Sequence, residues 1–173
     1  MLHLYLLRHG KSDWEAPSGS DHDRPLAPRG RRAARRVGRF LRELGQEPTS
    51  VVTSTAVRAR TTADFAAAAG SWNCPIRSSG DLYLSASAAL LAEARSEAGG
   101  VGRLMLVGHE PTWSQAVGLF SGGGRVRMVT AALARLDFPG NDWSRIDFGL
   151  ATLAWLITPK LLGVDEELKP PNL

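Results

Sequence analysis

The chain has little cysteine and little lysine, and its few histidines are scattered. Cys74 is the only cysteine among 173 residues, which excludes an intrachain disulfide and a cysteine-based zinc cluster. The four histidines, His3, His9, His22 and His109, do not lie at the spacings that metal ligands adopt. The sequence therefore predicts neither a metal site nor a bound cofactor.

A membrane segment is also missing from the sequence pattern. The apolar run that begins the chain, Leu2–Leu7, is too short to cross a bilayer. It also lacks the basic start and the small-residue cleavage site of a signal peptide. We therefore expect a cytoplasmic protein without a membrane partner.

Arginine carries nearly all of the positive charge. Lys+Arg number 21 against 17 Asp+Glu, a net charge of +4, and the only lysines are Lys11, Lys160 and Lys169. Such an excess suits an anionic substrate or an acidic partner. The arginines within residues 32–42 fit the solvated face of a helix, and no basic tract is interleaved with aromatic residues as single-strand binders require. We expect no nucleic-acid partner.

Strand and helix patterns alternate along the chain. Strands are predicted over residues 2–7, 50–53, 75–79, 103–107, 130–137 and 151–157, and helices over 29–45, 57–69, 85–98 and 112–120. This alternation predicts an α/β fold, a three-layer α/β/α sandwich with a largely parallel central sheet. We expect one domain over residues 1–173, with a loosely held tail from about residue 160.

Three local details accompany these predictions. The spacing of Ala34, Val37, Leu41 and Leu44 gives the first helix an apolar stripe, and Gly45 is expected to end that helix. A serine at position 85 or 87 is expected to cap the third helix.

Polar clusters follow three of the predicted strands. Arg8-His9-Gly10 ends the first, the segment 54–62 with Arg58 follows the second, and His109 follows Gly108 after the fourth. Because a doubly wound sheet brings such strand ends to one edge, we expect these four side chains to meet in one pocket. Two arginines and two histidines suit metal-independent phosphoryl transfer, which must balance the charge on the phosphoryl oxygens.

Together these segments resemble the histidine phosphatase superfamily, which includes phosphoglycerate mutases and acid phosphatases. Arg8-His9-Gly10 is similar to the family signature, the run from Ser54 to Thr62 to its second-arginine motif, and Val107–Pro111 to its second-histidine motif. The stretch Asp23–Gly30 resembles the RPLTxxG segment of the family. The small size of the chain makes the SixA-type phosphohistidine phosphatases the most similar branch, and the resemblance implies a phosphoglycerate mutase-like fold.

The resemblance also implies roles for these residues. His9 would be the nucleophile that is transiently phosphorylated, and Arg8 and Arg58 would hold the phosphoryl oxygens. His109 would be a further, cationic donor to the transition state. Arg60 is an alternative to Arg58, but Arg58 stands four residues after Ser54, where the family motif places its arginine. Lys11 is either a substrate-binding residue at the pocket rim or an exposed lysine.

One position departs from the family pattern. Larger members carry an acid that protonates the leaving oxygen, and here Leu84 stands at the equivalent place. Asp81 is a candidate substitute and substrate-binding residue, although a plain loop residue is the simpler interpretation. Loss of the acid lowers the rate on phosphate esters by roughly 10²–10⁴-fold, whereas a phosphoramidate nitrogen leaves readily once protonated.

The sequence therefore predicts a phosphatase, a hydrolase that acts on phosphohistidine-bearing proteins. A phosphatase for small phosphorylated metabolites and a catalytically idle phosphate-binding module are the alternatives. With few residues available for a capping subdomain, we expect a shallow, open mouth.

Overall fold

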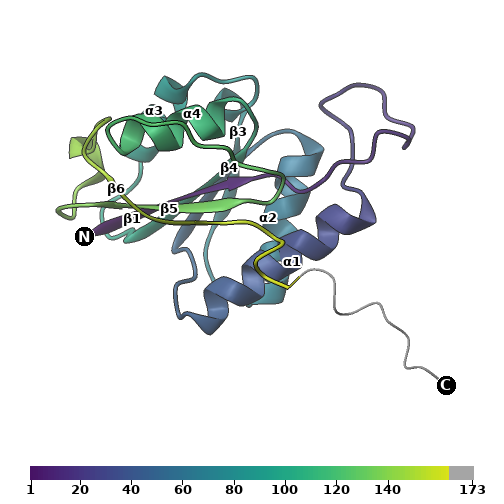
Figure 1. Ribbon diagram of the computed structural model, residues 1–173, viewed down its shortest axis with the longest axis horizontal. Coiled ribbons are helices and arrows are strands. Elements are labelled where there is room, and N and C mark those ends of the chain that lie inside the picture. The colour runs from purple at the N-terminus through teal and green to yellow at the C-terminus, as the bar shows by residue number, and fades with distance from the viewer. Residues whose placement is uncertain (164–173) are drawn as a thin grey trace.

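A computed structural model describes residues 1–163 of the chain. One six-stranded sheet runs through it in the order β3-β2-β4-β1-β5-β6 (Figure 1). The strands are β1 (Leu2–Arg8), β2 (Ser50–Ser54), β3 (Ile76–Ser79), β4 (Arg103–Gly108), β5 (Leu133–Phe138) and β6 (Thr152–Ile157). The helices are α1 (Pro28–Glu43), α2 (Val57–Gly70), α3 (Ser87–Arg95) and α4 (Thr112–Phe120), with 3₁₀ turns at Gly80–Leu82 and Trp143–Arg145.

The sheet is mostly parallel, as the sequence predicts. Strands β3, β2, β4 and β1 pair in parallel, whereas β5 pairs antiparallel to both β1 and β6. Strand β6 therefore runs in the direction of β1. The carboxyl ends of five strands and the start of β5 consequently lie at one edge of the sheet.

Two apolar cores cover the two faces of this sheet. Successive residues of β1 point to opposite faces, so Leu4 and Leu6 join the core under α3 and α4, while Tyr5 and Leu7 join the core under α1 and α2. All four are completely buried. This near-continuous burial explains why the run reads as apolar rather than alternating, and it confirms the three-layer architecture.

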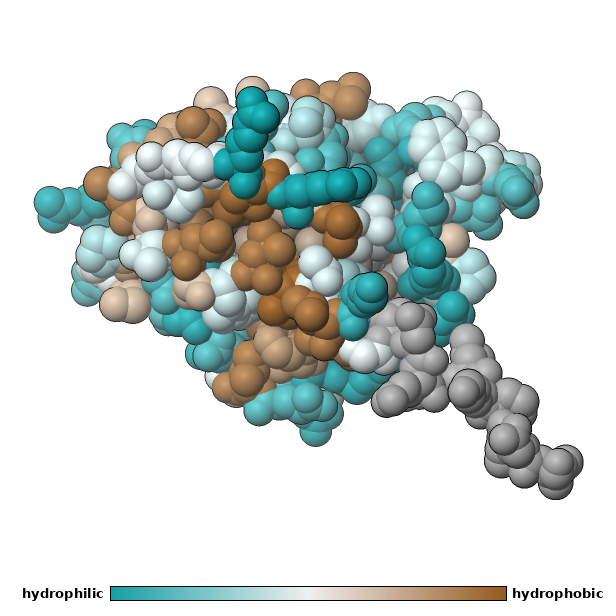
Figure 2. All heavy atoms as spheres, in the orientation of Figure 1, coloured by the Kyte–Doolittle hydropathy of each residue, from teal (hydrophilic) through white to brown (hydrophobic). Residues whose placement is uncertain are grey.

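The space-filling view shows a further apolar band on the visible face. Brown side chains cross the region where Figure 1 places β6 (Figure 2). Strand β6 forms one end of the sheet order, and Leu153, Leu156 and Ile157 on it are only partly buried. An edge strand has one neighbour, so its side chains are less covered than those of central strands.

Several local predictions need correction. The third helix begins at Ser87 with Ala86 at its N-cap and has no side-chain cap, and it ends at Arg95 rather than near residue 98. In the first helix Ala34, Val37 and Leu41 are buried, but Leu44 is 47% exposed because it follows the last helical turn. Gly45 has a φ of 63° and ends this helix as expected.

The predicted loose tail differs from the structure over its first four residues. Turn hydrogen bonds join Leu161 to Thr158 and Leu162 to Pro159, and the buried side chain of Arg36 donates to the Leu162 carbonyl at 3.1 Å. The rest of the predicted tail, residues 164–173, lies outside the described residues. Among residues 1–163, every helix falls short of the length and apolar character needed to cross a membrane. The cytoplasmic location stays a prediction.

Helices α1 and α2 approach most closely at Gly38, where a Cβ atom would lie 2.0 Å from the Ala66 carbonyl oxygen. We expect Gly38→Ala to lower the free energy of unfolding by about 1–3 kcal/mol, because the two backbones must separate. Gly99→Ala is the control, since its added methyl would meet nothing within 4 Å. Urea denaturation of both variants measures the effect, and equal stabilities would contradict close packing at Gly38.

Candidate active site

The ends of three neighbouring strands bring the two histidines together. Arg8 pairs with Gly108 in the register of β1 and β4, so His9 and His109 follow matched positions on adjacent strands. The His9 amide donates to the Gly108 carbonyl at 3.0 Å, and the two imidazole rings lie 5.1 Å apart between centroids. Ser54 ends the next strand, β2, and its Oγ lies 2.8 Å from Nε2 of His109.

The His9 ring has a defined tautomer. Its Nδ1 lies 2.7 Å from the Gly10 carbonyl oxygen. A carbonyl can only accept, so Nδ1 carries the proton and the lone pair is on Nε2. His9 is thus a neutral imidazole whose Nε2 lone pair is available, as the predicted nucleophile requires.

Glycines make this turn possible. A Cβ on Gly10 would lie 2.8 Å from the Gly30 carbonyl oxygen, and one on Gly30 would lie 2.2 Å from the Lys11 carbonyl oxygen. The first turn of α1 therefore packs directly on the backbone that follows His9. The Gly10 amide is fixed from the other side, where it donates to Oγ1 of Thr62 on α2 at 3.0 Å.

Both histidines are held in their neutral forms. Burial lowers the pKa of His9 to about 3, with the Gly10 carbonyl opposing the shift and His109, Arg58 and Arg8 adding to it. Burial and the Arg58 charge lower the pKa of His109 to about 4, against a smaller opposite effect of Asp21. The expectation of a cationic His109 is therefore wrong for the free protein, because burial beside two guanidinium groups disfavours a third positive charge.

The two arginines are anchored in a similar way. Nη1 of Arg8 donates to the Met128 carbonyl at 2.8 Å, and Nη1 of Arg58 donates to the Asp21 carbonyl at 2.5 Å. In both, Nε is buried and has no hydrogen-bond partner among residues 1–163, and the same holds for Nδ1 of His109. Buried polar groups are rarely left unsatisfied. Three unpartnered groups on three segments suit an anion with several acceptor oxygens.

Asp21 joins the segments around Arg58. Its Oδ2 accepts from Nη2 of Arg58 at 2.9 Å and from the Tyr83 hydroxyl at 3.1 Å, and its Oδ1 accepts from Arg24 at 2.5 Å. Burial alone would raise the pKa of Asp21, but Arg58, Tyr83 and Arg24 together lower it below its ordinary value. The carboxylate is therefore ionised at neutral pH, although its side chain is 50% exposed.

Three of the four predicted site residues are buried. Exposure is 8% for His9, 9% for His109 and 5% for Arg58. The segment between β1 and α1 contacts Arg58 through Asp21, and its His22 contacts Thr55 and the ring of Tyr83. This loop supplies cover that the small size of the chain does not suggest.

The remaining candidate residues lie around this centre. Lys11 is exposed and lines a neighbouring cavity, whereas Asp81 is exposed and lines a separate depression beside α3. Leu84 is 85% exposed with a φ of 51°, so it points outward where larger family members carry an acid. Arg60 pairs with Asp64 on the surface of α2, at 3.0 Å, and is thus less suited to the site than Arg58.

The sequence did not indicate Asp21, Tyr83 or Ser54 as site residues. One sequence signal could have pointed to Asp21. It stands three residues before Arg24, which lies in the stretch similar to the RPLTxxG segment. Trp113, the second residue of α4, is fully buried and packs on Gly108 and His109. Among the described residues, no three His, Cys, Asp or Glu side chains are grouped so that they could hold a metal ion.

Comparison with known proteins identifies the family. The model of the histidine phosphatase superfamily (branch 1) matches residues 4–82, which contain Arg8, His9 and Arg58. An uncharacterized protein of Mycobacterium tuberculosis is 36% identical over 165 residues, covering 89% of this chain and all of the relative. The chain belongs to the histidine phosphatase superfamily. The match ends before His109, which the pairing of β1 with β4 brings to the site.

Solved structures support the same family. A candidate phosphohistidine phosphatase SixA from Nakamurella multipartitia is 28% identical, with a TM-score of 0.78 over 91% of this chain and 96% of that one. Another from Agrobacterium tumefaciens is 26% identical, with a TM-score of 0.76 over 91% and 98%. The protein is therefore a phosphatase with a phosphoglycerate mutase-like fold, similar in structure to the SixA group.

Protonation of the buried histidines predicts acid sensitivity. The pKa of His9 is near 3 when folded and 6.5 when free, so the folded state binds fewer protons, and stability falls as pH drops below 6.5. The free energy of unfolding should therefore fall between pH 7 and pH 5. We expect this fall to be about 2 kcal/mol smaller in His9→Asn than in the wild type. Urea denaturation at both pH values measures this, and an equal loss in both proteins would contradict a neutral, buried His9.

Proposed function

We propose that this phosphatase removes phosphoryl groups from phosphohistidine side chains of other proteins, through a covalent phosphohistidine on His9 and without a metal ion. The ionised Asp21 beside Arg58 is the observation that carries the proposal. An ionised carboxylate cannot protonate the oxygen of a leaving alcohol, which an ordinary phosphate ester requires. It can instead accept a hydrogen bond from the N–H of a leaving imidazole ring.

The first step transfers the phosphoryl group between two imidazoles. Nε2 of His9 attacks phosphorus, a P–N bond to His9 forms, and the P–N bond of the substrate breaks. The electron pair of the broken bond returns to the substrate ring, which leaves as neutral imidazole because its other nitrogen already carries a proton. The positive ring charge passes to His9, where the Gly10 carbonyl holds the Nδ1 proton.

The second step releases phosphate. Water attacks the phosphorus on His9, the P–N bond breaks, and its electron pair returns to Nε2. The water protons end on phosphate and solvent, so the neutral ring is restored. Nε of Arg8 and of Arg58 would donate to the phosphoryl oxygens in both steps. If the Ser54 hydroxyl donates to Nε2 of His109, the ring proton lies on Nδ1, which can then donate as well.

The surroundings of Asp21 support a protein substrate. Three exposed apolar side chains border its network: Trp14 stacks on Arg24, Leu84 follows Tyr83, and the Val57 amide donates to the His22 carbonyl. Their exposure is 70% for Trp14, 85% for Leu84 and 37% for Val57. Exposed apolar side chains that lie together beside polar groups are typical of protein-binding surfaces. The resemblance to the candidate phosphohistidine phosphatases agrees with this substrate class.

Rapid-quench labelling tests the covalent step. We expect a phosphohistidine-bearing phosphotransfer protein to leave acid-labile phosphate on the wild-type protein and none on His9→Ala, and to turn over faster than sugar phosphates. Faster turnover of sugar phosphates would favour a small-molecule phosphatase. Failure to trap phosphate on the wild type with any phosphorylated compound would favour an idle binding module.

Asp21→Asn tests the leaving-group role. We expect kcat/KM for phosphohistidine to fall by roughly 10²-fold, since a neutral amide accepts a hydrogen bond from the N–H of the leaving ring less strongly than a carboxylate does. Activity on p-nitrophenyl phosphate should change less than about threefold, because its leaving group needs no proton and reports whether Arg58 stays in place. Asp23→Asn is the control, an exposed change in the same loop. Equal losses on both substrates would limit Asp21 to positioning Arg58.

A further inference from the structure

A cationic cavity lies beside the phosphoryl centre. It has a volume of about 390 Å³, and Lys11, Arg29 and Lys160 contribute to its lining. These three residues come from three separate parts of the chain: the turn after β1, the first turn of α1, and the turn after β6. Among residues 1–163, no acidic residue lines the cavity.

Its location follows from the sheet. Strand β6 runs in the direction of β1, so the residues after β6 reach the same edge as His9. Thr130 lines the cavity and precedes Ala131, whose amide donates to the carbonyls of both Arg8 and His9. Lys11 is two residues from His9, which limits the distance between their Cα atoms to about 7 Å. The cavity therefore begins within two residues of the predicted nucleophile.

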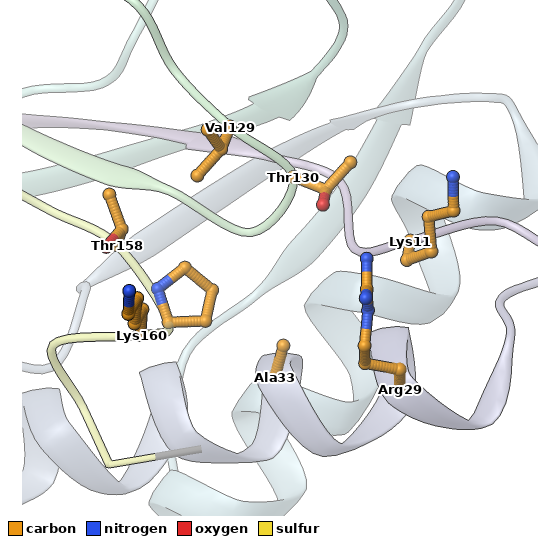
Figure 3. Close-up of a pocket in the computed structure, with 8 residues that line it drawn as sticks. Lys11, Arg29, Ala33, Val129, Thr130, Thr158 and Lys160 are labelled. Atoms are coloured by element: carbon orange, nitrogen blue, oxygen red, sulfur yellow. The ribbon is translucent and has the colours of Figure 1, made fainter. Parts of the chain in front are cut away.

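The cavity has two kinds of lining. Val129, Ala33 and Pro159 offer apolar surface, and the hydroxyls of Thr130 and Thr158 add hydrogen-bonding groups. Figure 3 shows Arg29 and Lys11 on one side of the cavity beside Thr130, Lys160 and Thr158 on the other, and Ala33 at the floor. Such a lining suits a ligand with an anionic end and a short apolar body.

The charge arrangement points to an anion. Some exposed arginines pair with carboxylates, as Arg77 does with Glu93 and Arg95 with Asp147, whereas Arg32 and Arg39 on α1 take part in no ion pair within residues 1–163. Within residues 1–163, none of the three cavity cations takes part in an ion pair. Like charges brought to one cavity repel, and a bound anion removes that repulsion.

We propose that this cavity is a subsite for a second anionic group of the substrate, a carboxylate or a phosphate carried next to the phosphoryl group. Resting on the proposed function, we infer that the group is an acidic side chain beside the phosphohistidine. The phosphoryl group would then lie on His9, the leaving ring toward Asp21, and the acidic side chain between Lys11, Arg29 and Lys160.

Matched peptides test the subsite. One phosphohistidine peptide carries glutamates at the two positions on each side, and the other carries glutamines. We expect wild-type kcat/KM to be roughly three- to tenfold higher for the glutamate peptide, with the ratio falling as salt is raised. In the double variant Arg29→Ala/Lys160→Ala the ratio should fall to about one. A wild-type ratio near one, or a ratio that survives in the double variant, would overturn the subsite.

The control variant and the second substrate pair separate the explanations. Arg32→Ala/Arg39→Ala removes the same charge from exposed positions of α1 that do not line the cavity, and its ratio should equal that of the wild type. Equal falls in both double variants would overturn the subsite in favour of general charge attraction. Hydrolysis of the glutamine peptide by the wild type tests the proposed function by itself.

A pair of alkyl phosphates tests whether the anionic group at the subsite belongs instead to a small molecule. One alkyl phosphate carries a terminal carboxylate and the other carries the matching amide. If the wild type hydrolyses neither peptide but prefers the carboxylate phosphate, and Arg29→Ala/Lys160→Ala loses that preference, the subsite stands and the phosphohistidine proposal fails. If that preference is absent as well, both fail.

Discussion

The site depends on one short hydrogen bond, from Nδ1 of His9 to the carbonyl of the next residue, Gly10. This bond fixes the tautomer and leaves the Nε2 lone pair that the proposed attack on phosphorus needs. It requires the chain to turn sharply after β1, and the turn is held between Gly30 on α1 and Thr62 on α2. The two helices under the sheet therefore do more than cover an apolar face. Their packing sets the backbone geometry on which the nucleophile depends.

The site contains two positively charged arginines, but its two histidines stay neutral. Arg58 is buried and Arg8 is partly buried, both cations lie close to two imidazoles, and burial of the histidines with this charge keeps both neutral. Each guanidinium is anchored through Nη1 to a backbone carbonyl, which holds its direction, and Arg58 also pairs through Nη2 with the Asp21 carboxylate. The nucleophile thus stays unprotonated over the physiological pH range, while an arriving phosphoryl group still meets two fixed positive charges.

Much of the fold could be predicted because strand ends and buried runs are local features. The register of β1 against β4 carries His9 and His109 together, and Gly108 at the end of an apolar run already indicates it. Asp21 could not be found this way, because it lies in a polar loop and its importance comes from Arg58, Tyr83 and Arg24 in space. The charge of His109 was also missed, since burial beside arginines is a tertiary effect. The missing cap on α3 shows that a nearby serine does not ensure a capping bond.

The sheet order places groups of opposite charge on opposite sides of the site. The nucleophile lies at the ends of the central pair β1 and β4, with the carboxylate of Asp21 toward the β2 and β3 side and the cavity of Lys11, Arg29 and Lys160 toward the β5 and β6 side. A substrate with a protonated ring at one end and an acidic group at the other would meet opposite charges in one orientation and like charges in the reverse. Like-charge contacts would oppose the reverse orientation and complementary contacts would favour the first, so under the proposed function this arrangement would contribute to the choice among phosphorylated substrates.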